Sequence, residues 1–243
     1  MSTKRWVAAV AGIAGLTALA GTAYASPTFA IRISDGSTTT TINDNGAGDL
    51  DATGGSILSS PTFTGYTIGA VTSDFSNSSG TLSLDLNGLT LKKTASGAGT
   101  LTIMTTVTGF AGAGLNLSVA DNFTGTNAHS GATITSTSDA KLYISTADTA
   151  FGLGTLLTDT GALGTLNFSG ATSDYLASLS GPISVTLVKT ISFSNSAPSG
   201  AGFTNSASAS VPEPASMSLL GTGLLGAGWF MKRRRKKNAA KAA

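Results

Sequence analysis

The side chains that could carry catalysis or bind a ligand are few in this chain of 243 residues. His129 is the only histidine, Glu213 is the only glutamate, and there is no cysteine. Thiolate zinc sites and cysteine nucleophiles are therefore excluded, and a catalytic carboxyl pair would have to be two aspartates. The chain also lacks the Gly-x-Ser-x-Gly turn that presents a serine nucleophile. We therefore expect a protein that is not an enzyme, with a secreted hydrolase that uses His129 as the alternative.

The densest acidic segment is residues 43–51, where oxygen-bearing side chains are closely spaced around glycines. Such oxygens suit Ca²⁺, and the candidate ligands are Asp44, Asn45, Asp49 and Asp51. In a twelve-residue EF-hand loop, however, the first and last positions would hold Thr41 and Ala52, so two key ligands are missing. A polar hairpin loop is the favoured interpretation, and we expect no cofactor.

The cations are concentrated at the two ends of the chain. Of the 14 Lys and Arg residues, only five lie between residues 26 and 210, together with eleven aspartates. That body therefore has a formal charge of −6, five minus eleven, although the whole chain carries +2. Because a nucleic-acid partner requires a basic surface, we expect none here.

The first 25 residues have the parts of a secretory signal peptide. Lys4 and Arg5 precede an apolar run over residues 7–20, which leads to Ala23-Tyr24-Ala25. Signal peptidase admits only small side chains at Ala23 and Ala25, so we expect cleavage between Ala25 and Ser26. The signal segment is expected to be helical in the precursor.

The C-terminal end has a second membrane-directed pattern. Residues 215–231 are 17 residues without a charge, which as a helix would be ~26 Å long, slightly short of a ~30 Å hydrocarbon core. Six consecutive cations follow, namely Lys232, Arg233, Arg234, Arg235, Lys236 and Lys237. Because such a cluster stays in the cytoplasm, it predicts a weak, transient transmembrane anchor with the acidic body outside and a short cytoplasmic tail at residues 238–243.

A short motif, Val211-Pro212-Glu213-Pro214, lies directly before this apolar stretch. Its two prolines hold the backbone extended, which is the form that a protease or transpeptidase can grip. Motif, apolar helix and basic cluster together resemble the PEP-CTERM sorting domain of Gram-negative bacteria, over residues 211–237. The resemblance implies processing by exosortase, delivery to the cell surface or extracellular matrix, and association with exopolysaccharide and biofilm.

The body, residues 26–193, reads as about ten short strands separated by Gly, Asn, Asp and Ser. Residues 81–86 alternate between apolar and polar, and Asn87-Gly88 predicts a tight turn into a further strand. Only residues 147–157 indicate a turn of helix. The pattern predicts an all-β fold, an antiparallel β-sandwich or jelly roll.

Residues 194–210 consist mostly of Ser, Ala, Gly and Asn. Such a segment buries too little apolar surface to offset the entropy cost of ordering it, so we expect a flexible linker to the sorting signal.

These features together favour an exported, non-enzymatic protein of the cell surface or extracellular matrix. Its expected partners are signal peptidase and exosortase during processing, the membrane through its C-terminal helix, and exopolysaccharide. A carbohydrate- or calcium-binding β-sandwich module is the alternative. Sugars usually stack on Trp or Tyr, however, and the body has only Tyr66, Tyr143 and Tyr175.

Overall fold

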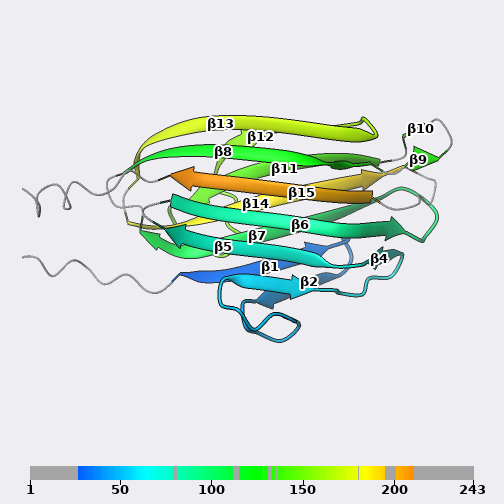
Figure 1. Ribbon diagram of the computed structural model, residues 1–243, viewed down its shortest axis with the longest axis horizontal. Coiled ribbons are helices and arrows are strands. Elements are labelled where there is room, and N and C mark those ends of the chain that lie inside the picture. Colours follow the sequence, from blue (N-terminus) through cyan, green and yellow to red (C-terminus); the bar gives the residue numbers. More distant parts are fainter. Residues whose placement is uncertain are drawn as a thin grey trace, which may run out of the picture.

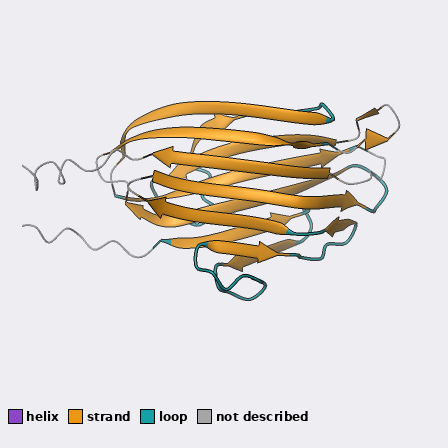
Figure 2. Cartoon of the chain, viewed as in Figure 1, coloured by secondary structure: helices purple, strands orange, loops and turns teal. Residues whose placement is uncertain are grey.

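A computed structural model describes residues 27–78, 81–111, 115–127, 129–130, 133–134, 136–179, 181–194 and 201–210. These residues form strands, turns and loops, and none of them is helical (Figure 2). The expected signal helix and transmembrane helix lie outside the described residues.

The strands are numbered in chain order. They are β1 (Thr28–Ser34), β2 (Thr39–Asn43), β3 (Ser56–Ser59), β4 (Tyr66–Ile68), β5 (Val71–Ser78), β6 (Thr81–Lys93), β7 (Gly99–Ala111), β8 (Leu115–Thr126), β9 (His129–Ser130), β10 (Thr133–Ile134), β11 (Ser136–Ser145), β12 (Thr155–Asp159), β13 (Asn167–Leu179), β14 (Pro182–Phe193) and β15 (Ala201–Ser210).

Two antiparallel sheets pack face to face as a β-sandwich (Figure 1). The six-stranded sheet has the order β12-β11-β14-β7-β1-β2. The seven-stranded sheet has the order β13-β8-β15-β6-β5-β3, with β4 paired to β6. Strands β9 and β10 form a separate two-stranded ribbon. The predicted all-β, antiparallel architecture is therefore confirmed.

The hydrophobic core lies between the two sheets and follows the alternation of the strands. In β6, Leu82, Leu84 and Leu86 are buried, because every second side chain faces the opposite sheet. In β14, Val185 and Leu187 face them from the other side and are buried as well. The apolar alternation that predicted a strand at residues 81–86 thus forms one wall of the core.

Strand β14 is buried on both faces, because residues 146–154 fold over the outer face of its sheet. The amide of Phe151 donates to Oγ1 of Thr106 in β7 at 3.2 Å, and Oγ1 of Thr106 lies 3.0 Å from that of Thr186 in β14. Asp148 and Phe151 have φ of 50° and 58°, outside the helical range. The predicted turn of helix is therefore wrong: these residues form turns that lead into β12.

The predicted hairpin turn at Asn87-Gly88 is also wrong, since β6 runs through it without a reversal. Asn87 pairs with Thr72 of β5 on one side and with Thr204 of β15 on the other. The pairing with β15 shifts register near Gly88. Glycine within a strand commonly marks such an irregularity, so two-sided pairing outweighs the local preference for a turn.

Candidate functional site

The last described strand, β15, leads directly into the predicted sorting motif. It lies between β6 and β8 near the middle of the seven-stranded sheet and pairs with both along its length. Its final residue, Ser210, pairs with Thr81 of β6 and Ser118 of β8. Val211 is the next residue, so the fold reaches the first residue of the motif.

A flexible linker was expected over residues 194–210, but residues 201–210 form a central strand, and residues 195–200 lie outside the described residues. The prediction counted only the apolar surface of the segment itself. A strand between two neighbours is stabilised by backbone hydrogen bonds on both edges, which small polar residues make as well as large ones. The strict alternation of Ser and Ala over residues 206–210 was the available signal.

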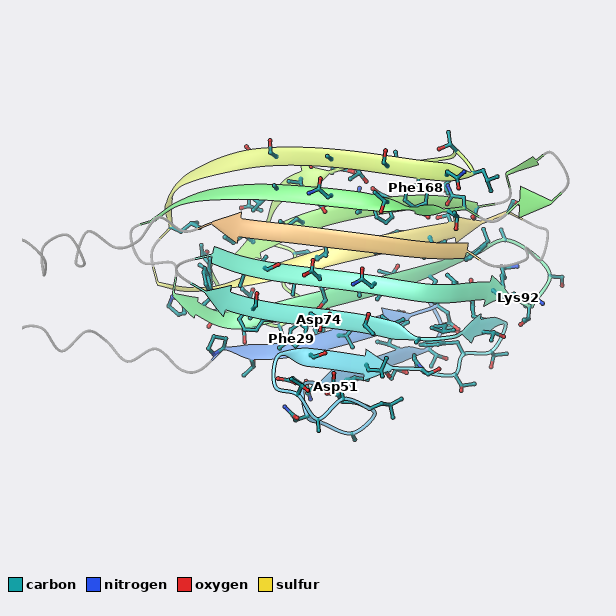
Figure 3. All side chains as sticks on the ribbon, in the orientation of Figure 1. Phe29, Asp51, Asp74, Lys92 and Phe168 are labelled. Atoms are coloured by element: carbon teal, nitrogen blue, oxygen red, sulfur yellow. The ribbon has the colours of Figure 1, made fainter. Side chains whose placement is uncertain are left out.

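The chain starts and finishes its path through the sandwich at the same end. Figure 1 shows the first residues of β1 and the arrowhead of β15 at the left of the molecule. Phe29, near the start of β1 and labelled in Figure 3, packs against Phe75 of β5 with ring centres 5.9 Å apart. The segments before Pro27 and after Ser210 are therefore attached to one end of the fold.

The predicted processing and anchoring residues lie outside the described part of the chain. They are Ala23, Ala25 and Ser26 of the signal peptidase site, Val211, Pro212, Glu213 and Pro214 of the motif, and the six cations from Lys232 to Lys237. Within the described ranges, no helix is long and apolar enough to cross a membrane.

The candidate calcium residues lie in the loop between β2 and β3, in which Figure 3 labels Asp51. Oδ1 of Asp49 accepts the amides of Asp51 and Leu58 at 3.0 and 3.1 Å, and Oδ2 accepts the amide of Asn45 at 2.9 Å. Oδ2 of Asp44 accepts the amide of Gly55 at 2.8 Å. These carboxylates thus bind backbone amides of their own loop and of β3, as a polar hairpin loop requires.

Gly55 constrains the backbone at the end of this loop. Gly55 has φ of 85°, and a Cβ built there would lie 2.8 Å from the carbonyl oxygen of Phe75. Only glycine fits a position with this φ and this close backbone approach. Sequence reasoning did not single out Gly55, which fixes the loop against β5.

His129 lies in β9, where it pairs with Ile134 of β10. Across the described residues, no three or more His, Cys, Asp or Glu side chains lie close enough together to hold a metal ion.

Sequence reasoning missed a pair of buried ionisable groups between the two sheets. Lys189 of β14 is fully buried, and its Nζ donates to the carbonyl oxygen of Leu86 at 3.2 Å. Asp121 of β8 is 1% exposed, and its Oδ2 accepts the hydroxyl of Thr158 at 3.2 Å. These residues are far apart in the sequence, and no local pattern brings them together.

Burial shifts the pKa values of both groups toward their neutral forms. Removal from water lowers the pKa of Lys189 well below its ordinary value, and the nearby Asp121 opposes this only partly. Burial raises the pKa of Asp121 to about 6, against the hydrogen bond from Thr158 and the charge of Lys189. Oδ1 of Asp121 has no hydrogen-bond partner among the described residues.

A comparison with protein families decides the nature of the C-terminal end. Residues 210–235 match the family description of the PEP-CTERM protein-sorting motif. The chain carries a PEP-CTERM sorting signal. This confirms the resemblance that residues 211–237 suggested. The PEP-CTERM motif is the recognition signal of exosortase, so it indicates export and processing at the C-terminal end, and a location outside the inner membrane.

The solved structures that match this chain are distant from it. The VP2 subviral particle of infectious bursal disease virus is 14% identical, with a TM-score of 0.32 over 79% of this chain and 54% of that one. TmCBM61, in complex with beta-1,4-galactotriose, is 10% identical, with a TM-score of 0.28 over 67% of this chain and 90% of that one. The chain spans about half the length of VP2, and TM-scores this low carry no functional argument. No curated protein matches the chain.

Proposed function

We propose that this protein is an exported, non-enzymatic component of the cell surface or extracellular matrix. A C-terminal helix anchors it transiently, exosortase processes it near Val211-Pro212-Glu213-Pro214, and it associates with exopolysaccharide in the biofilm. The observation that carries the proposal is the PEP-CTERM match at residues 210–235, which begins where the sandwich ends. The anchor and the fold are therefore adjacent in the chain.

The fold limits where processing can occur. Because Ser210 still pairs with β6 and β8, a cut before residue 201 would remove a central strand from the mature protein. A cut at the motif leaves β15 in place. The mature protein is therefore expected to end after Ser210.

The surface of the body supports a role in a hydrated matrix. Thr39 and Thr41 of β2 are exposed, as are Ser169 and Ser173 of β13. Hydroxyl groups on strand faces can exchange hydrogen bonds with water and with polysaccharide. Together with the formal charge of −6 of the body, this surface favours solubility after release.

The alternative of a sugar-binding module receives no support from the aromatic side chains of the body whose burial is described. Tyr66 and Tyr143 are half-buried, as is Phe75. The other phenylalanines whose burial is described are buried, namely Phe29, Phe63, Phe110, Phe123, Phe151, Phe168 and Phe193. Stacking on a sugar ring requires an exposed aromatic face, so we retain the matrix role as the proposal.

Deletion of residues 212–214 in the producing organism tests this function. We expect the variant to remain with the membrane fraction, uncut, with loss of matrix to the extent seen in a full gene deletion. A chain that lacks only the tail, residues 238–243, is the matched control and is expected to be processed normally. Unchanged processing without residues 212–214 would refute the sorting route, and an unaltered matrix in the gene deletion would refute the matrix role.

A further inference from the structure

Lys189 crosses the sandwich from the six-stranded sheet to the seven-stranded sheet. Its Nζ lies 3.2 Å from the carbonyl oxygen of Leu86 in β6 and 4.8 Å from the ring centre of Phe123 in β8. Lys189, Leu86 and Phe123 are each 0% exposed. The amine is therefore held in a dry interior beside the two strands that flank β15.

The strand register places an asparagine between these two contacts. Asn205 of β15 pairs with Leu86 of β6 and with Phe123 of β8, so the row across the three strands reads Leu86, Asn205, Phe123. The adjacent row on the same face reads Leu84, Ala207, Asp121, because residues two apart in a strand share a face. The amine of Lys189 thus contacts the two residues that pair with Asn205, and the buried carboxyl of Asp121 belongs to the neighbouring row.

We propose that Lys189 and Asn205 form an intramolecular amide bond that joins the two sheets, with Asp121 as the proton carrier. Nζ of Lys189 attacks the carboxamide carbon of Asn205, while Asp121 donates a proton to the carboxamide oxygen. The proton that Nζ loses passes through Asp121 to the departing nitrogen, which leaves as ammonia. When the carbonyl re-forms, the proton on its oxygen returns to Asp121. One C–N bond forms and one breaks, Asp121 regains its starting state, and no oxidant or reductant is needed.

The protonation states suit this reaction. A buried lysine with a lowered pKa supplies the neutral amine that acts as nucleophile, and the raised pKa of Asp121 supplies a carboxyl that can give up and regain a proton. The hydroxyl of Thr158, which donates to Oδ2 of Asp121, orients that carboxyl. The bond would also remove the cost of burying an amine that can carry a charge.

The position of the bond gives it a mechanical consequence. β15 precedes the PEP-CTERM motif directly, so a force applied to the C-terminal end acts first on β15. An amide from Asn205 to Lys189 would transmit that force to β14 in the other sheet. The chain has no cysteine, so a disulfide cannot serve this purpose. This inference does not depend on the matrix role.

Mass spectrometry of the protein purified after export tests the bond. We expect an intact mass lower, by one ammonia, than the mass of the sequence between its measured ends. Trypsin should fail to cut after Lys189, and chymotrypsin cleavage after Phe193 should leave the two resulting pieces joined. A mass equal to that of the sequence, with normal cleavage after Lys189, would overturn the proposal. A deficit of one water, with residues 94–141 joined to Lys189, would overturn it too, because Asp121 would then be the acyl partner.

Three variants separate the proposed roles. Lys189→Met and Asp121→Ala should both lose the mass deficit completely. Lys141→Met is the control, since Lys141 forms a surface ion pair with Asp139 at 3.3 Å, and it should keep the full deficit. Retention of the deficit in Asp121→Ala would refute the role of Asp121. Where a variant does not accumulate, the intact mass of the unaltered protein still decides whether the bond exists.

Discussion

Strands β14 and β15 are consecutive in the chain and both lie inside a sheet, yet they are built from opposite kinds of sequence. Strand β14 reads PISVTLVKTISF, and most of its side chains are buried on both faces. Strand β15 reads AGFTNSASAS, with one large apolar residue. β14 pairs with β7 and β11, and β15 pairs with β6 and β8.

The contrast shows two ways to hold a central strand. β14 is stabilised by apolar side chains that face the core and by residues 146–154, which cover its outer face. β15 depends on its two backbone ladders and on neighbours that already supply the apolar surface. The amino-acid composition therefore predicted a strand at β14 and failed to predict one at β15.

Removal of β15 should have the largest effect on the stability of the fold. A chain ending at Ser194 should lose cooperative unfolding, whereas a chain ending at Ser210 should unfold in one transition. The two lost ladders, at about 1 kcal/mol for each hydrogen bond, approach the whole ~5–15 kcal/mol stability of a domain. Urea denaturation followed by circular dichroism measures this, and equal stability of the two chains would show that β15 is dispensable.

Truncation of a single side chain in β14 should have the next largest effect. Leu187 is fully buried, so Leu187→Ala should lower the free energy of unfolding by about 2–5 kcal/mol. The matched control is Leu156→Ala in edge strand β12, where the leucine is 44% exposed and the cost should stay below about 1 kcal/mol. Similar losses at both positions would contradict the assignment of β14 to the core.

The pH dependence of stability should report on Asp121, which pairs in register with β15 and lies near Lys189 of β14. The folded state raises the pKa of this carboxyl from 3.8 to about 6, so it holds the proton more tightly than the unfolded state does. The resulting stabilisation is complete below pH 4 and is lost as pH rises to about 6, on the order of 3 kcal/mol in total.

Asp121→Asn should remove this part of the pH dependence, since an amide does not titrate. Thermal unfolding of both proteins between pH 3.5 and pH 7 (about the span of the two pKa values) gives the comparison. Burial also raises the pKa values of Asp85 and Asp139, and both remain in the variant. Parallel stability curves for the two proteins would contradict the assigned burial of Asp121.

The acidic loop lies outside the two strands and should give the smallest effect. Asp49→Ala removes an acceptor of three backbone amides and should cost about 1–2 kcal/mol. Asp51→Ala removes the acceptor of the Thr53 amide and should cost less. Millimolar Ca²⁺ should leave the melting temperature unchanged, because these carboxylates already bind the loop backbone, and a rise of several degrees would restore the calcium hypothesis.

The sequence predicted those parts of the fold that depend on local alternation. The sequence alternation predicted β6 through Leu82, Leu84 and Leu86. The same period of two that marks a strand also places these side chains in the core. Asn87-Gly88 was misread as a turn, since its pairing partners, Thr72 and Thr204, come from distant parts of the chain.

The sorting signal was readable from sequence, whereas the buried ionisable pair was not. The motif, apolar stretch and basic cluster are contiguous, so a linear pattern is enough to identify the signal. Lys189 and Asp121 meet only because β14 and β8 lie in facing sheets. The local indication of a buried ionisable group was a lysine among the apolar residues of β14. The sequence does not indicate which residue lies near that lysine.

The C-terminal residue of the exported protein tests most directly whether the sorting signal follows a complete sandwich. Mass spectrometry of material released from the cell surface should find an end after Ser210, with β15 retained and the basic cluster of residues 232–237 removed. An end before Ala201, or a surface protein that still carries the basic cluster, would contradict the account.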